Sequence, residues 1–403
     1  MQQKNEKNYI VLYSTEKVDR QSLHDLKSST PAFKATNKEL LKSKFDITVE
    51  SIDNQNEHEI LKGNRNVIAL APAIPLKLIK PNQVKSRSAE ISEGNLWNID
   101  ALGLALTPYT GKGIKMAILD TGIDKTHPAF DGLIIVEKDF TGEGNGDTHG
   151  HGTHCAGVAF GRDVNGKRIG VAKGVEEVLI GKVLGQHGGG SDILVDAINW
   201  AVKGGAHIIS MSLGIDFPGY VAELENDGMQ TEAAVSYALE GYRKNILLFE
   251  RLASLIRTQS INKSIQPVLI LGAAGNESSR PAYKIAVSPP AISDGIVSVG
   301  ALGKKGEDLY VAEFSNTGVS LSAPGIDILS AKIGGGLISM DGTSMATPHV
   351  AGVAALWAEK LISKRQFNFN NLLAHLTASC SDTKLAKEHP EDFGSGVIQA
   401  PSK

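Results

Sequence analysis

Three short segments of the chain contain a hydroxyl nucleophile, an imidazole and a carboxylate. Ser344 lies in G-T-S-M-A-T-P-H, between a flexible turn and a long apolar segment of helical character. His151 lies in G-H-G-T-H-C-A-G, and Asp120 begins D-T-G after an apolar run. Serine attacks a carbonyl only when a base removes its proton, and histidine has the pKa for that role near neutral pH. A carboxylate can orient the ring and stabilise the imidazolium, so this set indicates acyl transfer through serine.

Each of these residues also has a structural interpretation. Ser344 alone is a helix N-cap, and Asp120 alone is a buried capping acid. Asn276, in A-A-G-N after an apolar run, is either a turn residue or a donor that stabilises an oxyanion together with the backbone N–H of Ser344.

The histidines near His151 raise the alternative of a metal site. His149, His151 and His154 crowd together, but no HExxH or carboxylate ligand pattern accompanies them. We therefore expect His149 in an exposed loop, and His154 and His349 hydrogen-bonded to neighbouring backbone.

The elements that must position these residues follow an α/β pattern from Gly111 onward. Apolar runs alternate with helical patterns, such as the one around Leu194 and Ala201, as in a mostly parallel sheet with helices on both faces. Reactive groups usually collect at the carboxyl ends of such strands. The expected strands are Ile114–Leu119, Val178–Leu184, His207–Leu213, Val268–Ala273 and Ile296–Val299.

Residues 1–80 predict a separate small α+β domain, joined to a larger domain at 96–403 by a polar linker at 81–95. Its expected elements are strands at Tyr9–Tyr13, Phe45–Ile52 and Val67–Leu70 and helices at Val18–Leu26 and Glu57–Lys62.

Composition narrows the class of protein. The chain has 403 residues, 41% of them hydrophobic and 21% charged, with a net charge of −3. These values are typical of a globular protein and give no reason to expect nucleic-acid binding. No apolar run reaches a membrane-spanning length, and the polar start predicts a cytoplasmic protein, with unconventional export left open. The two cysteines, Cys155 and Cys380, predict free thiols.

Taken together and in this order, the D-T-G, H-G-T-H-x-A-G, A-A-G-N and G-T-S-M-A-T-P-H-V-A-G blocks resemble the subtilisin-like serine peptidases, or subtilases, over roughly residues 95–400. The resemblance implies a three-layer fold and hydrolysis of peptide bonds. It also implies that Asp120, His151 and Ser344 form the catalytic triad and that Asn276 is the oxyanion donor.

Two glycine-containing segments resemble the edges of the family's substrate cleft, where backbone pairs with an extended peptide from both sides. The expected substrate-binding residues are Gly188, Gly189, Gly190, Ser212, Leu213 and Gly214.

The N-terminal domain resembles a subtilase prodomain in position, size and pattern. Such a domain assists folding and inhibits the enzyme, and we expect its tail from Ile79 to Ser88 to lie along the cleft, with self-cleavage at 81–95. An uncleaved regulatory domain is the alternative.

Residues 216–266 form an insertion, about thirty residues longer than usual in the family, that predicts one or two amphipathic helices. This insertion is either an ornament packed on the core or an element of the cleft rim or of partner docking.

No cofactor is expected to be required, and calcium is left open. His127-Pro128 is followed by Ala129 rather than an acid, and the loop of Asp163 and Asn165 fits either a calcium site or a β-turn. Cys155 resembles the free cysteine of proteinase K-like members, and a small buried hydrophobe is its alternative interpretation.

The sequence thus predicts a serine endopeptidase that acts on peptide or protein substrates through an acyl-enzyme. A dedicated maturation protease with one partner and a non-catalytic binding protein are the alternatives.

Overall fold

The computed structural model describes residues 6–14, 45–53, 67–79, 96–385 and 388–402 of the chain. An eight-stranded sheet lies at its centre, in the order β13-β12-β11-β9-β5-β7-β6, with β14 also pairing with β12. Its pairings are parallel except that of β12 with β13. The strands are β5 (Met116–Asp120), β6 (Ile134–Asp139), β7 (Glu177–Lys182), β9 (Ile208–Met211), β11 (Leu269–Ala273), β12 (Ile296–Lys305), β13 (Asp308–Val311) and β14 (Leu321–Pro324).

Successive buried side chains along the strands alternate between the two faces of this sheet, which divides the hydrophobic core into two clusters. Met116 and Ile118 of β5 belong to a buried cluster with residues of α5 and α9, whereas Ala117 and Leu119 belong to a second cluster with residues of α6 and α8. Successive strand side chains point to opposite faces, so helices cover both. The expected three-layer α/β fold is confirmed. The helices are α4 (Trp97–Ala101), the 3-10 helix η2 (Pro128–Phe130), α5 (His151–Phe160), α6 (Ser191–Lys203), α7 (Phe217–Asn226), α8 (Thr231–Ile261), α9 (Thr343–Ser363), α10 (Phe369–Ser379) and α11 (Pro390–Phe393).

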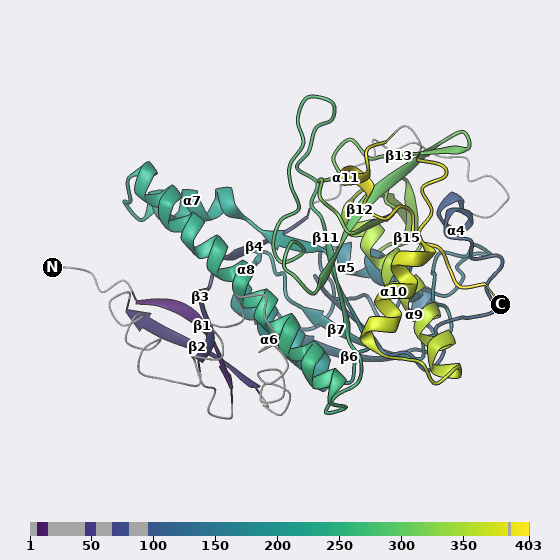
Figure 1. The fold of residues 1–403 in the computed structure, drawn as a ribbon, viewed down its shortest axis with the longest axis horizontal. Coiled ribbons are helices and arrows are strands. Elements are labelled where there is room, and N and C mark those ends of the chain that lie inside the picture. The colour runs from purple at the N-terminus through teal and green to yellow at the C-terminus, as the bar shows by residue number, and fades with distance from the viewer. Residues whose placement is uncertain (1–5, 15–44, 54–66, 80–95, 386–387, 403) are drawn as a thin grey trace, which may run out of the picture.

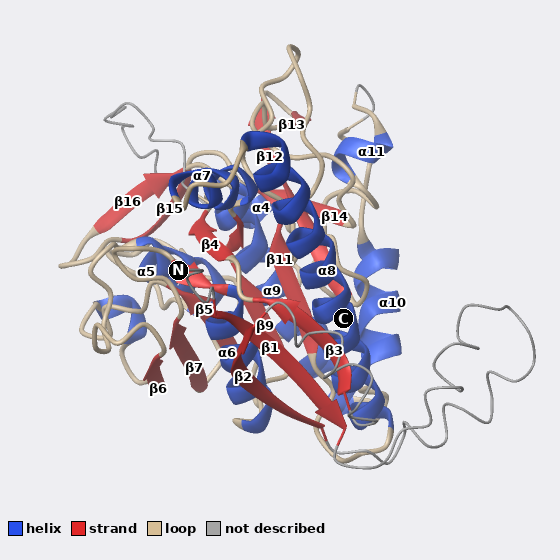
Figure 2. Cartoon of the chain, turned by 90° about the vertical axis from the view of Figure 1, so that its left-hand side faces the viewer, coloured by secondary structure: helices blue, strands red, loops and turns tan. Residues whose placement is uncertain are grey.

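The N-terminal segment forms its own three-stranded antiparallel sheet, in the order β2-β1-β3. Its strands are β1 (Glu6–Ser14), β2 (Phe45–Asp53) and β3 (Val67–Pro72), so the three expected strands are confirmed. The helices expected at 18–26 and 57–62 lie outside the described residues. The sheet lies against the long helix α8 (Figures 1 and 2), and Ile10 and Leu12 share the buried cluster of α6 and α8.

A short strand that the sequence did not predict, β4 (Pro75–Leu78), continues from this small sheet into the larger domain. It lies between β10 (Leu213–Ile215) and β8 (Gly189–Gly190) and pairs antiparallel with both. Strand β4 thus ends just before the tail, Ile79–Ser88, that was expected to lie in the cleft. Most of this tail lies outside the described residues. Strands β15 (Ile328–Ala331) and β16 (Leu337–Met340) form a separate hairpin.

The 216–266 insertion folds as two helices, α7 and α8, as its periodicity predicts. Phe249 and Leu252 are buried in the core, but Val235 and Leu239, which belong to the same periodic pattern, are 41% and 58% exposed. The buried Asn245 of α8 donates from Nδ2 to the carbonyl oxygen of Pro72, at 2.9 Å. The insertion therefore packs on the core with one half and contacts the N-terminal sheet.

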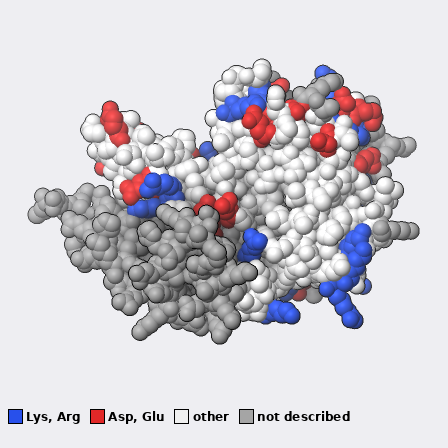
Figure 3. All heavy atoms as spheres, in the orientation of Figure 1, with Lys and Arg blue, Asp and Glu red and all other residues white. Residues whose placement is uncertain are grey.

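On the face shown in Figure 3, acidic and basic side chains are interspersed and neither gathers into an extended patch. Within the described ranges, no helix is both long and apolar enough to cross a membrane.

Candidate active site

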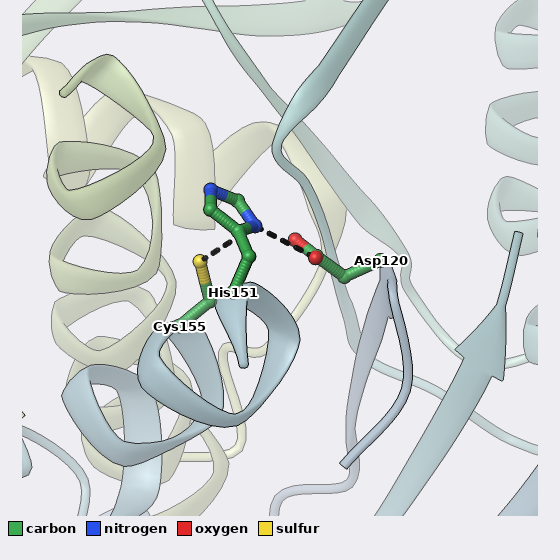
Figure 4. A group of neighbouring side chains, drawn as sticks. All are labelled: Asp120, His151 and Cys155. Carbon is green, nitrogen blue, oxygen red and sulfur yellow. Dashed lines mark hydrogen bonds and ion pairs between the residues drawn. The ribbon is translucent and has the colours of Figure 1, made fainter. Parts of the chain in front are cut away.

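Asp120 and His151 meet at the carboxyl end of β5. Asp120 is the last residue of that strand, and His151 is the first residue of α5. His151 Nδ1 donates to Asp120 Oδ1 at 2.7 Å, with side chains 0% and 1% exposed (Figure 4). Asp120 Oδ1 also accepts from the backbone N–H of Thr121 at 2.7 Å. The carboxylate therefore fixes the ring tautomer and leaves Nε2 to act as a base.

This pairing depends on a close approach between α5 and the turn after β5. Gly150, the N-cap of α5, has φ of 93°, in the left-handed region that favours glycine. A Cβ at Gly152 would collide with the carbonyl oxygen of Gly122. The glycines beside His151 thus bring its ring to Asp120.

The buried Asp147 holds the same turn and was missed by sequence reasoning. Its carboxylate accepts from Thr121 Oγ1 at 3.0 Å, from the backbone N–H groups of His149 and Gly150 at 2.9 and 2.8 Å, and from the backbone N–H and Oγ1 of Thr153 at 2.9 and 2.6 Å. An acid just before a helix start is the local signal that could have indicated it.

The environment of His151 alters its basicity. Complete burial opposes the charged ring, but the neighbouring Asp120 carboxylate and Cys155 side chain together outweigh burial and hold the pKa of His151 well above its ordinary value of 6.5. A base with a raised pKa accepts a proton readily and stabilises the imidazolium that results.

Ser344 is the second residue of α9 and is fully buried. Its Oγ donates to the carbonyl oxygen of Ile79, the residue after β4, at 3.1 Å. Its own carbonyl oxygen accepts from Cys155 Sγ at 3.3 Å and Ser212 Oγ at 3.2 Å. Cys155 Sγ lies 3.8 Å from His151 Nδ1, so it touches both the serine backbone and the imidazole.

Asn276 lies three residues after β11 and is oriented by the residue before the serine. Its Oδ1 accepts from both the backbone N–H and the Oγ1 of Thr343, each at 2.9 Å. These bonds occupy the amide oxygen and assign the amide nitrogen as the donor. Sequence reasoning did not single out Thr343, although it stands in the G-T-S block.

Most of the expected cleft residues flank β4. Leu213 pairs with Leu78 and Gly214 with Lys77 on one side, and Gly189 pairs with Leu76 and Gly190 with Pro75 on the other. A Cβ on Gly188 would lie 2.9 Å from the carbonyl oxygen of Leu76, so Gly188 also lies against the strand. The Ser212 side chain instead bonds to the backbone of Ser344.

The model of the subtilase family matches residues 111–396, which is more than half of the chain. The chain is 35% identical over 297 residues to an intracellular serine protease of Paenibacillus polymyxa, covering 70% of this chain and 76% of that protein. It is 34% identical over 255 residues to the major intracellular serine protease of Bacillus subtilis (strain 168), covering 61% and 68%. The chain belongs to the subtilase family. It is a subtilisin-like serine endopeptidase, a hydrolase.

A solved structure extends the similarity of fold. Fervidolysin from Fervidobacterium pennivorans, described as a keratinolytic enzyme related to subtilisin, matches with a TM-score of 0.64 and 21% identity over 98% of this chain and 60% of that chain. At this low sequence identity, the match supports only the fold of this subtilase and not its substrate.

Three further histidines of this subtilase, His149, His154 and His349, lie as expected. His149 is exposed, whereas His154 Nε2 bonds to the carbonyl oxygens of Ile328 and Ile338, at 2.9 and 3.1 Å, and His349 Nδ1 to that of Met345, at 2.7 Å. Burial lowers the pKa of His154 to about 3 and that of His349 to about 4. Both rings are therefore neutral at physiological pH.

The loop considered for calcium is a turn with its acid already paired. Asp163 accepts from Lys173 Nζ at 2.8 Å, and Asn165 has φ of 52°. Over the ranges that the structure describes, Asp120, His151 and Cys155 form the only cluster with three potential ligand atoms within 4.8 Å of one another. His149 and His154 are not part of this cluster. Two of its three members, Asp120 and His151, are already hydrogen-bonded to each other in this subtilase.

Proposed function

We propose that Ser344 is the nucleophile of this endopeptidase, His151 its general base, Asp120 the group that orients His151, and Asn276 an oxyanion donor. The contact of Ser344 Oγ with the Ile79 carbonyl, at 3.1 Å, carries this assignment. It places a peptide carbonyl at the serine, at the end of a strand held between two cleft edges.

The reaction follows from these positions. An extended peptide takes the place of β4, so that β10 and β8 supply backbone hydrogen bonds. Ser344 Oγ attacks the carbonyl carbon while His151 Nε2 takes its proton, and the oxyanion is stabilised by the Asn276 amide and the Ser344 backbone N–H. His151 then protonates the leaving amine, the peptide bond breaks, and water hydrolyses the acyl-enzyme by the same route.

Residues 1–80 act, in this account, as a prodomain that inhibits the enzyme it belongs to. Pro75–Leu78 occupies the cleft, and Ile74 and Ser191 exchange hydrogen bonds at 3.0 and 3.1 Å where the segment passes α6. The apolar contact of Ile10 and Leu12 with α6 and α8 retains the small sheet beside the cleft. A domain that binds only the folded protease also stabilises that fold.

The bond that would be cut in self-processing is Ile79–Lys80. This position is one residue before the linker 81–95, in which the sequence placed cleavage, because Ile79 is the residue whose carbonyl meets Ser344. The uncleaved regulatory domain remains the alternative.

Expression of the wild type beside Ser344→Ala tests both statements. We expect the wild-type protease to begin at Lys80 and to digest casein, and Ser344→Ala to keep its N-terminus and lose that activity. Identical N-termini would overturn self-processing, and casein digestion by Ser344→Ala would overturn the assignment of the nucleophile.

Peptide or protein substrates follow from the class of enzyme, and a cytoplasmic location is proposed because two of the similar proteins are named intracellular.

A maturation protease with one dedicated partner would leave casein uncut while still reacting at Ser344. The insertion was its expected docking element, but α8 contacts the chain's own N-terminal sheet. We therefore favour an endopeptidase of broader range that needs no cofactor. Calcium dependence would appear as a loss of thermal stability with a chelator.

A further inference from the structure

We propose that Asp216 and Glu277 select peptides with a basic side chain at the third residue before the bond that is cut. This inference rests on the proposed function, because it takes Pro75–Ile79 as the chain's own example of a bound substrate. Lys77 occupies that third position, with Leu78 and Ile79 following it.

The Lys77 ammonium lies between two carboxylates. Nζ is 3.3 Å from Asp216 Oδ1 and 3.7 Å from Glu277 Oε1. The three side chains are 36%, 31% and 36% exposed, so they are partly screened by solvent without being fully hydrated. All three line a cavity of about 760 Å³ beside β4, together with Leu78 and Asn276.

The backbone register fixes which substrate side chain reaches these acids. Lys77 pairs with Gly214, two residues before Asp216, and the backbone N–H of Asp216 donates to the carbonyl oxygen of Pro75 at 3.1 Å. Since neighbouring side chains of a strand point in opposite directions, Leu76, which is buried, turns away from the acids. Any peptide that forms these pairings presents the side chain of the third residue before the bond that is cut to Asp216 and Glu277.

Both carboxylates are held in place by groups outside the peptide. Asp216 is the N-cap of α7, where Oδ1 accepts from the backbone N–H of Gly219 at 3.3 Å. Glu277 Oε2 accepts from Asn316 Nδ2 at 2.8 Å, which leaves Oε1 toward Lys77. Prior fixation reduces the side-chain entropy lost when a cation binds. Asp216 begins the helical insertion, and Glu277 directly follows Asn276, so the pair joins the insertion to the oxyanion site.

The test compares three peptides that differ only at the third position, X-Leu-Lys-Leu-Ile, X-Leu-Nle-Leu-Ile and X-Leu-Glu-Leu-Ile, each followed by the same leaving segment. Partly exposed ion pairs are individually weak, so we expect kcat/KM to be about three- to tenfold higher for lysine than for norleucine, and lowest for glutamate. The preference should shrink at 1 M salt. In Asp216→Asn/Glu277→Gln it should disappear, whereas Glu223→Gln, which neutralises an exposed acid on the same insertion, should keep it.

The full-length chain supplies a second readout. Its self-processing should slow in the order wild type, Lys77→Met and Lys77→Glu. Equal cleavage of the three peptides, or a preference that survives in the double variant, would overturn this inference while leaving the proposed function intact. Absence of any cleavage, with Ser344 unreactive toward a fluorophosphonate, would instead overturn the proposed function and this inference with it.

Discussion

Ser344 Oγ donates to the carbonyl oxygen of Ile79 at 3.1 Å, across the interface between the N-terminal segment and the catalytic domain. The two residues are brought together by β4, whose pairing with β10 and β8 sets the position of the carbonyl along the cleft. The chain thus presents its own peptide to its own serine. This contact supports both the proposed reaction and the proposed inhibition by the N-terminal segment.

Asp120→Asn should lower kcat on the order of 10⁴-fold, because an amide cannot hold His151 in the tautomer that accepts the serine proton. Asp120 also raises the pKa of His151. The neutral ring is the base, so activity of the wild type should rise with pH through a value above 6.5, and this limb should move to lower pH in the variant. A pH profile of kcat/KM measures both effects, and an unmoved limb would contradict the role of Asp120.

Asn276→Ala should reduce kcat by about 10²- to 10³-fold, with a small change in KM. This is the size known for an oxyanion-hole asparagine in subtilisin, about 3 kcal/mol. Thr343→Val, which keeps the backbone N–H bond to Asn276 Oδ1 and removes the hydroxyl bond, should lose less. Asn226→Ala, an exposed change on α7, is the control. A loss confined to KM would show that Asn276 binds the ground state rather than the oxyanion.

The buried histidines predict loss of stability in acid. His154 and His349 have pKa values of about 3 and about 4 in the folded protein, below the ordinary 6.5. The unfolded chain therefore binds more protons, and the stability that they contribute is complete above pH 6.5 and falls as pH drops toward 4. The slope is about 1.4 kcal/mol per pH unit for each histidine.

Denaturant unfolding in a Ser344→Ala background, which avoids autolysis, measures that slope between pH 6 and 4.5. His349→Asn should reduce it by about 1.4 kcal/mol per pH unit even if the variant is less stable at every pH. A slope equal to that of the parent would mean that His349 is not held neutral.

Cys155 predicts sensitivity to mercurials. Its thiol is buried against His151 and the Ser344 backbone, so a bound mercury atom would displace the imidazole. Inhibition should persist in Cys380→Ala and vanish in Cys155→Ala. Full activity of a protein shown by mass spectrometry to be modified at Cys155 would contradict this prediction.

The sequence could predict the elements whose character is local. The blocks around Asp120, His151 and Ser344 combine a reactive side chain with glycines that the close packing of α5 and β5 requires. Apolar runs located five of the eight central strands, as with Ile114–Leu119 against β5 at Met116–Asp120. Strands β6, β13 and β14 were not predicted, and β12 continues six residues beyond its expected end at Val299.

The features that the sequence did not reveal depend on tertiary contacts. Pro75–Leu78 is too short to show a strand pattern, and its partners β10 and β8 lie far away along the chain. Asp147 gains its role only when Thr121 and Thr153 come together around it. Val235 and Leu239 follow the apolar period of α8 yet are exposed, because periodicity does not say how far a helix extends beyond the core.

Every step of the proposed reaction requires that Ser344 is the residue that attacks the substrate. A fluorophosphonate probe, followed by peptide mapping, tests this directly in the self-processed wild type and in His151→Ala that has been cleaved after Ile79 by added wild-type enzyme, so that the N-terminal segment covers the serine in neither protein. We predict one modified residue, Ser344, in the wild type and strongly reduced labelling in the variant. Labelling at any other residue, or equal labelling in both proteins, would contradict it.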